Sequence, residues 1–264
     1  MLGMFRDLIR YRYFIIISIK NDILSRFANS KLGALWVLIN PLAQVAIFAL
    51  ILSNVLAAKL PGITNKYAYA IYLMSGLLVW TLFNDIFNRC LNMFIDQGNM
   101  IKKINFPRIT LPLIVVGTSM VNNFLLFAAT MLIFVSLGHN FTWMILWIVP
   151  LHLSVILFTT SLGLIFGIMN VFIRDIGQSM PIILQMLFWF TPIVYPINIV
   201  PAEYHHLFYF NPIISFTEAY QNILTYGIAP NLVPVSIITG IGFALALLSL
   251  LMFRRANSEL VDHI

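Results

Sequence analysis

The sequence predicts an all-α integral membrane protein with six transmembrane helices, and two observations lead to this fold class. Hydrophobic residues make up 61% of the 264 positions and charged residues only 9%, whereas roughly a quarter of a soluble domain is charged. The apolar residues also form runs of about twenty, the length that a helix needs to cross a bilayer. A transmembrane barrel would instead show alternating segments of about ten residues. Lipid offers the backbone no hydrogen-bond partner, so helices are expected.

The basic residues predict the orientation of these helices. Of the fifteen Lys and Arg residues, only Lys59 and Lys66 lie outside the segments expected on one side of the membrane. Loops that remain in the cytoplasm are enriched in Lys and Arg. The net charge of +6 is therefore interpreted as membrane topology rather than nucleic-acid binding, with both termini in the cytoplasm.

The chain is expected to form one transmembrane domain over residues 1–264. Residues 1–31 alternate apolar and basic side chains near helical spacing, which favours an amphipathic helix in the cytoplasmic membrane interface. A loosely ordered basic tail is the alternative. The predicted spans are 32–58, 67–88, 111–137, 141–169, 180–195 and 232–253.

A short charged segment, residues 95–108, separates the second and third predicted spans. It combines Gly98, Pro107, three basic residues and an acid in a chain with little other charge nearby. We interpret it as a cytoplasmic helix through which a separate motor protein moves the membrane helices. The alternative is that Lys102, Lys103 and Arg108 only enforce orientation.

Two further features concern helix packing and the outer side. Gly163 and Gly167 have the spacing of small residues that lets membrane helices approach closely. Residues 197–231 contain no Lys or Arg, yet prolines interrupt them. This segment is too apolar for a free loop and too interrupted to span, which favours short re-entrant helices packed against protein.

Motifs for catalysis and nucleotide binding are absent. The sequence has no Gly-rich phosphate loop of the G-x-x-x-x-G-K-[ST] type, and Cys90 is the single cysteine, so no disulfide within the chain and no metal site are predicted. His152 is expected to be a hydrogen-bonding packing residue. The alternative class is a membrane acyl- or glycosyltransferase acting on lipid-linked sugars, whose acid and histidine residues would come from Glu203, His205, His206 and Glu218.

Several motifs, in order along the chain, carry a resemblance to a known family. They are SKLGALWVLINPL at 30–42, GLLVW at 76–80, NMIKKINFP at 99–107, FIRD at 172–175, FTPIVYP at 190–196 and NP at 211–212. Together they resemble the permease subunit of ABC-2 type polysaccharide exporters, which move O-antigen, capsule and teichoic acid chains. The resemblance extends over essentially the whole length and is greatest to the O-antigen branch.

The resemblance implies a homodimer in the bacterial inner membrane with two copies of a separate cytoplasmic ATPase, which binds ATP and Mg²⁺ while this chain binds no cofactor. Residues 95–108 would be the coupling helix that contacts the ATPase. Its matching positions are Asp96, Gln97, Asn99, Lys102, Lys103, Phe106, Pro107 and Arg108. The N-terminal helix would form a second cytoplasmic contact through Arg10, Lys20, Arg26 and Lys31.

The implied substrate is a polysaccharide linked to a polyprenyl pyrophosphate, with teichoic acid, capsule and drug export left as alternatives. Candidates for the pyrophosphate contact are Arg26, Arg89, Arg174 and Asp175, because guanidinium groups suit phosphate oxygens. Sugar rings pack on aromatic faces, so residues 197–231 and the preceding motif would supply an outer gate and channel. The candidates are Trp189, Phe190, Tyr195, Pro196, Tyr204, Tyr209, Pro212, Glu218 and Tyr220.

Overall fold

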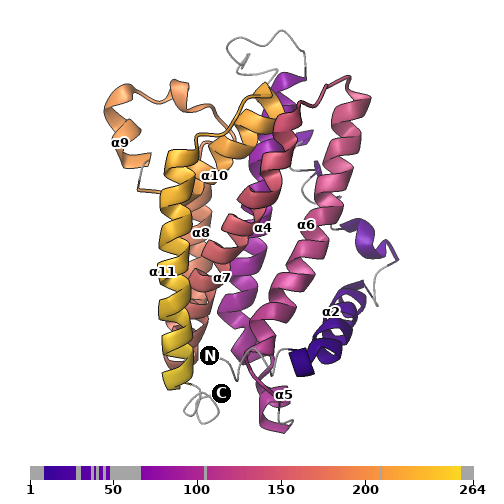
Figure 1. The fold of residues 1–264 in the computed structure, drawn as a ribbon, viewed down its shortest axis with the longest axis vertical. Coiled ribbons are helices and arrows are strands. Elements are labelled where there is room, and N and C mark those ends of the chain that lie inside the picture. The colour runs from indigo at the N-terminus through magenta and orange to yellow at the C-terminus, as the bar shows by residue number, and fades with distance from the viewer. Residues whose placement is uncertain are drawn as a thin grey trace.

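The computed structural model describes residues 9–27, 31–36, 39, 42–43, 46–47, 67–103, 106–208 and 210–256. These residues form helices and turns and contain no β-strand (Figure 1). In chain order the helices are α2 (Arg12–Phe27), η1 (Gly33–Leu35), α4 (Ala68–Asp96), α5 (Gly98–Lys103), α6 (Thr110–Ser136), η2 (Trp143–Trp147), α7 (Ile148–Phe172), α8 (Asp175–Trp189), η3 (Ile197–Ile199), η4 (Ala202–Tyr204), α9 (His205–Phe208), α10 (Pro212–Gln221), η5 (Asn222–Tyr226) and α11 (Leu232–Ala256).

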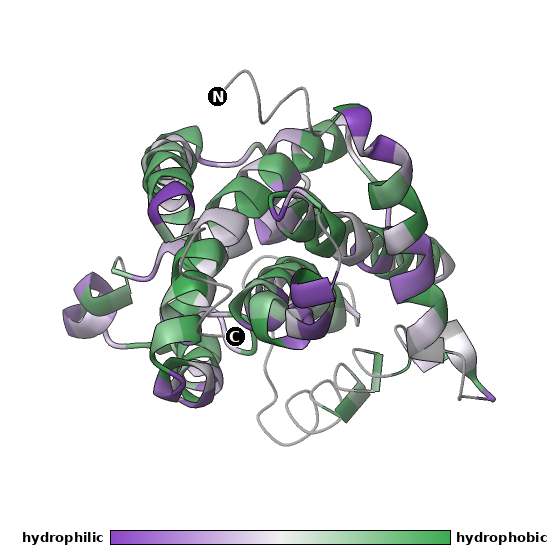
Figure 2. Cartoon of the chain, turned by 90° about the horizontal axis from the view of Figure 1, so that it is seen from below, coloured by the Kyte–Doolittle hydropathy of each residue, from purple (hydrophilic) through white to green (hydrophobic). Residues whose placement is uncertain are grey.

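Four helical stretches are long and apolar enough to cross a membrane: α4, α6, η2 with α7, and α11. Residues of high hydropathy make up most of these helices (Figure 2), and many of them face outward, with Phe124, Leu132 and Val149 each more than 60% exposed. The bundle thus presents hydrocarbon side chains where a soluble protein would present charges. Most of the first predicted span, 32–58, lies outside the described residues.

The second and fifth predicted spans differ most from the structure, whereas the ends of the others agree within three residues for the helices described. The second span was expected to end at 88, but α4 continues to Asp96 because its last turns bury Leu91 and Phe94 in the core. The fifth was expected over 180–195, but α8 runs from Asp175 to Trp189. It ends before Thr191-Pro192 because proline disfavours a helical conformation in the residue before it. With 15 residues, α8 is only about 22 Å long.

Helix α4 is the centre of the bundle and contacts α6, α7, α8 and α10. It lies between α6 and α7 in Figure 1. The side chains of Leu73, Val79 and Ile86 are fully buried, and successive rings on α4 pack in tilted contacts, with 6.0 Å between the centroids of Phe83 and Phe87. Because α4 is buried on nearly every side, its position is fixed by contacts with all of its neighbouring helices.

Helix α7 approaches α4 closely at Gly163 and Gly167. A Cβ atom at Gly167 would lie 2.3 Å from the carbonyl oxygen of Cys90, and one at Gly163 would lie 2.7 Å from the Cβ of Cys90. Only glycine fits at these distances. The close approach predicted from the glycine spacing is confirmed.

Helices α2 and α5 lie at one end of the bundle, the α5 end, and α9 and α10 lie at the other, the α10 end (Figure 1). Helix α2 packs on α6, where Ile19 fits against Gly117, and the ring of Phe14 lies 5.4 Å from that of Phe106. The other face of α2 exposes Tyr13 and Ile16. An apolar face turned away from the bundle suits a helix in a membrane interface.

At the α10 end, the segment Thr191–Pro196 is held by side chains from two helices. Tyr72 of α4 and Gln221 of α10 both donate hydrogen bonds to the carbonyl of Pro192, at 3.0 and 3.1 Å. Tyr69 of α4 donates to the carbonyl of Val194 at 2.5 Å. These bonds satisfy backbone carbonyls that no helix pairs, as an apolar surrounding requires.

The glycine contact yields the first prediction. Gly167→Ala should lower the stability of the protein by about 1–3 kcal/mol, because the new methyl group overlaps the α4 backbone. Gly240→Ala on α11 is the matched control, since a Cβ there has open space within 4 Å. Thermal unfolding in detergent should show a lower Tm for the first variant only. Equal Tm values would contradict the α4–α7 packing.

Candidate functional site

The charged segment predicted to be one helix over 95–108 has three parts. The end of α4 is followed by the short helix α5 and then by a turn at 106–109, while Ile104 and Asn105 lie outside the described residues. The helix is not continuous because Phe106 precedes Pro107, which disfavours helical geometry. The carbonyl of Pro107 instead accepts a hydrogen bond from the Thr110 hydroxyl at 2.8 Å, and α6 begins there.

Residues 96–103 and 106–108, which we call the α5 segment, expose polar side chains and are anchored to the bundle by apolar ones. Its exposed side chains are Asp96, Gln97, Asn99, Lys102 and Lys103. Ile101 and Phe106 are only 7% exposed and anchor it to the bundle, while Pro107 and Arg108 are half-buried. A short, anchored helix joined to both α4 and α6 can transmit a push from a partner to two long helices.

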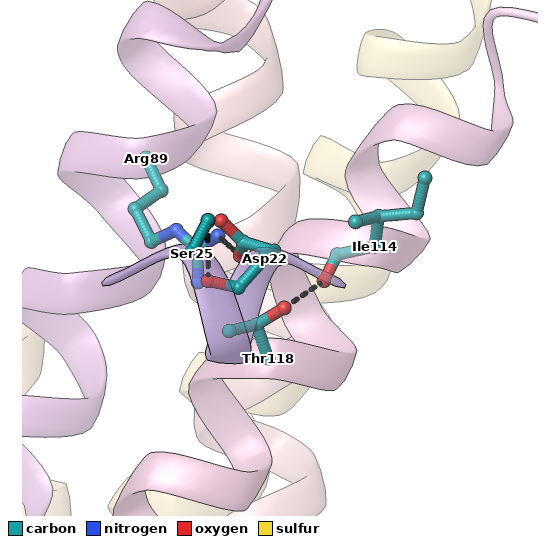
Figure 3. Close-up of polar contacts among 5 residues, drawn as sticks. All are labelled: Asp22, Ser25, Arg89, Ile114 and Thr118. Carbon is teal, nitrogen blue, oxygen red and sulfur yellow. Dashed lines mark hydrogen bonds and ion pairs between the residues drawn. The ribbon is translucent and has the colours of Figure 1, made fainter. Parts of the chain in front are cut away.

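Beside this segment lies a cavity of about 480 Å³ between α2, α4, α5 and α6. Arg89 of α4 forms an ion pair with Asp22 of α2 in its wall (Figure 3), with 16% and 30% of the two side chains exposed. Asp96 lines the same cavity. The Arg89 guanidinium is therefore largely neutralised, and its ion pair ties α2 to α4.

The other predicted basic residues lie apart from this ion pair. Arg10, Lys20 and Lys31 are exposed, and the side chain of Arg26 lies outside the described residues. Arg174 and Asp175 are exposed on the turn between α7 and α8, and they do not line the cavity. Asp175 occupies the first turn of α8, where a carboxylate is favoured by the helix dipole.

A second cavity, of about 430 Å³, lies between α4 and α8, and we call it the α4–α8 groove. Its lining residues are Trp80, Asn84, Asn88, Pro181, Leu184, Gln185, Phe188 and Trp189. Indole rings offer flat faces for stacking, and the amides of Asn84, Asn88 and Gln185 each offer donors and an acceptor. This combination suits a neutral ligand rich in hydroxyl groups.

Two of the three groove amides lie one turn apart on α4, and the third, Gln185, lies on α8. Asn88 donates from its side chain to the Asn84 side-chain oxygen at 2.9 Å, and Asn92 donates to the backbone carbonyl of Asn88 at 3.1 Å. Of the groove residues, the sequence had pointed to the aromatic side chains of Phe188 and Trp189. The recurrence of asparagine every fourth residue, at 84, 88 and 92, is the signal that would have indicated Asn84 and Asn88.

The predicted gate residues divide into a surface set and a packed set. Trp189, Phe190 and Tyr204 are each more than half exposed, and the Tyr195 hydroxyl donates to the carbonyl of Trp189 at 2.6 Å. Pro196 precedes η3 as its N-cap residue. Tyr209 lies outside the described residues.

The packed set belongs to α10, which begins at Pro212 after the N-cap Asn211. Tyr220 is 1% exposed, and its hydroxyl lies 2.7 Å from Nδ1 of His152. His152 is thus a packing hydrogen bonder, as predicted. Glu218 is half-buried, and this burial raises the pKa of its carboxyl.

The residues considered for an enzyme do not converge. Glu203 and His206 are exposed, and His205 contacts the backbone carbonyl of Val200 at 2.9 Å, whereas Glu218 lies on α10. In the described ranges, no three His, Cys, Asp or Glu side chains are placed to share a metal ion.

Comparison with known proteins defines the class of this membrane bundle. Residues 13–225 match the family described as ABC-2 type transporter, and the chain belongs to that family. This chain is therefore a transport subunit, and the family implies a partner ATPase subunit.

The curated relatives are named for polysaccharide transport. The chain is 26% identical to the O-antigen export system permease protein RfbA of Klebsiella pneumoniae, over 96% of this chain and 95% of the relative. It is 24% identical to the protein of the same name from Myxococcus xanthus, over the full length of both. It is 23% identical to the polysialic acid transport protein KpsM of Escherichia coli, over 75% of each chain.

The Asp22–Arg89 ion pair yields a second prediction. Asp22→Asn and Arg89→Gln should each cost about 1–3 kcal/mol, because each leaves a partly buried charge without its partner. The double variant should be more stable than the sum of the two losses predicts, which thermal unfolding of all four proteins would measure. Asp175→Asn combined with Arg89→Gln is the control and should be additive. If the stability losses of Asp22→Asn and Arg89→Gln were additive, the ion pair would not join α2 to α4.

Proposed function

We propose that this chain is the permease subunit of an ATP-driven exporter that moves a polyprenyl-pyrophosphate-linked polysaccharide, similar to O-antigen, across the bacterial cytoplasmic membrane. The α4–α8 groove carries this proposal. Its wall holds two indole rings and three amides, contributed by the central membrane helix α4 and by α8. Stacking on aromatic faces and paired amide hydrogen bonds is the chemistry that sugar rings require.

The relatives support a polysaccharide over a small apolar drug. O-antigen and polysialic acid, named in RfbA and KpsM, are both chains of sugars. A drug-binding cavity in lipid would be mostly apolar, whereas the groove has Asn84, Asn88 and Gln185 in its wall.

We propose six spans per subunit: the four long helices, α8 with the segment after it, and residues 32–58. The α5 end faces the cytoplasm in this topology, because Lys102 and Lys103 lie on the exposed α5 and Arg254 and Arg255 end α11. Residues 197–231 then form the outer gate. Two such subunits assemble with two ATPase copies, which bind ATP and Mg²⁺.

In this proposal α5 is the coupling element. The exposed side chains of Asn99, Lys102 and Lys103 contact the ATPase, while Ile101 and Phe106 pass its displacement to the bundle. The exposed bases Arg10, just before α2, and Lys20, within α2, would form a second contact on the same side.

The pyrophosphate would meet arginines at the α5 end. Arg174 is exposed there, and Arg26 follows from sequence alone. Arg89 takes part only if phosphate oxygens replace Asp22 at its guanidinium. Such an exchange would release α2 from α4 as the lipid head group arrives.

Reversing the charge of the α5 bases tests the coupling. Lys102→Glu with Lys103→Glu should reduce co-purification with the ATPase encoded beside this protein, or reduce the ATPase activity of the complex, by tenfold or more. Arg254→Glu with Arg255→Glu is the matched control, an exposed basic pair at the same end on α11. The coupling role fails if both pairs behave alike.

Filling the α4–α8 groove with a larger side chain tests whether the polysaccharide passes through it. Asn88→Phe should lower export of the polysaccharide at least tenfold while the ATPase complex still forms, because the ring takes the place of the amides that solvate sugar hydroxyl groups. Trp143→Ala removes an aromatic side chain that is 86% exposed on η2 and should leave export unchanged. Normal export by the Asn88 variant, measured as surface polysaccharide, would show that the polymer passes elsewhere.

A further inference from the structure

A third, smaller cavity lies between α4 and α6, away from the groove. Its volume is about 160 Å³, which is several water volumes. Thr81 and Asp85 of α4 and Ser119, Asn122 and Asn123 of α6 line it. Three of these side chains each have a buried oxygen atom without a hydrogen-bond partner: Asp85, Ser119 and Asn123.

The amide of Asn123 shows which way its oxygen points. Its nitrogen donates to the backbone carbonyl of Leu78 at 3.0 Å and to the Thr81 hydroxyl at 3.4 Å. The flipped amide would set its oxygen against the Leu78 carbonyl, two acceptors in contact, so the orientation is fixed. The side-chain oxygen Oδ1 is then left without a donor, in a residue that is 5% exposed.

The hydroxyl of Ser119 is also unusual on its helix. Thr118 bonds to the carbonyl of Ile114 at 3.0 Å (Figure 3), and Thr130 bonds to that of Leu126 at 2.8 Å. Such bonds to the preceding turn satisfy most Ser and Thr side chains in membrane helices. Ser119, at 1% exposure, has no such bond and lines the cavity.

Asp85 provides a negative charge at the same cavity. Arg89, one turn away on α4, pairs with Asp22 instead, and Asp85 forms no ion pair with any residue in the described ranges. The predicted first span, residues 32–58, contains no Lys or Arg that could reach it. Asp85 is half-buried, and its Oδ2 atom is buried without a hydrogen-bond partner. A carboxylate without a partner is costly in a membrane helix.

We propose that the α4–α6 cavity binds one hydrated alkali cation, Na⁺ or K⁺, through the side-chain oxygens of Asp85, Ser119 and Asn123. Hard cations prefer oxygen ligands of these types, and one carboxylate balances one positive charge. Water completes the coordination in the remaining volume. The ion holds α4 to α6, and the inference is independent of what the transporter carries.

The test compares the Tm of the full-length purified chain in NaCl, KCl and N-methylglucamine chloride at equal ionic strength. A ligand of the native state raises stability with the logarithm of its concentration above Kd. One alkali salt should therefore raise the Tm relative to N-methylglucamine, and the salt that does so identifies the ion. Asp85→Asn and Asn123→Ala should abolish this difference, while the control Thr130→Ala should retain it.

Direct binding keeps the proposal testable if a variant does not fold. Radiolabelled Na⁺ and the K⁺ analogue Rb⁺ should bind the wild-type chain saturably and stoichiometrically in equilibrium dialysis, and Ser119→Ala should weaken this binding tenfold or more. Identical wild-type Tm values in the three salts, together with no saturable binding, would overturn the proposal and leave a cavity filled with water alone.

Discussion

The contact of α4 with α7 at Gly163 and Gly167 is the constraint on which the rest of the structure depends. It places the backbones of two membrane helices within van der Waals contact and buries α4 in the middle of the bundle. Every site described above includes residues of α4. Tyr72 holds the Thr191–Pro196 segment, Asn88 lines the groove, Asp85 lines the small cavity, and Arg89 binds α2.

A single rigid helix connects these sites. Helix α4 has 29 residues and is therefore about 43 Å long, so it reaches from the α10 end to α5. Its polar side chains are distributed by face: asparagines toward α8, Asp85 toward α6 and Arg89 toward α2. If a partner displaced α5, helix α4 would carry that displacement to the groove and to the Thr191–Pro196 segment.

Composition and charge pattern predicted the helical class, because a backbone in lipid must satisfy its own hydrogen bonds, and apolar runs of about twenty residues do so as helices. The Gly163 and Gly167 contact and the role of His152 also followed from local residue types. The end of α4 at Asp96 was not predicted, because burial by neighbouring helices extends this helix. The early end of α8 was not predicted either, because the proline that follows it ends the helix. The Asp22–Arg89 pair joins residues 67 positions apart, and no local pattern predicts such a partner.

The most direct test of the conduit is photo-cross-linking in cells that make the lipid-linked polysaccharide. A photoreactive residue at Gln185, an exposed side chain in the α4–α8 groove, should form a covalent adduct that carries sugar. The same residue at Val149, a surface position on α7 that is 63% exposed, should form none. Sugar adducts at Val149 but not at Gln185 would contradict the assignment of the groove as the path of the polymer.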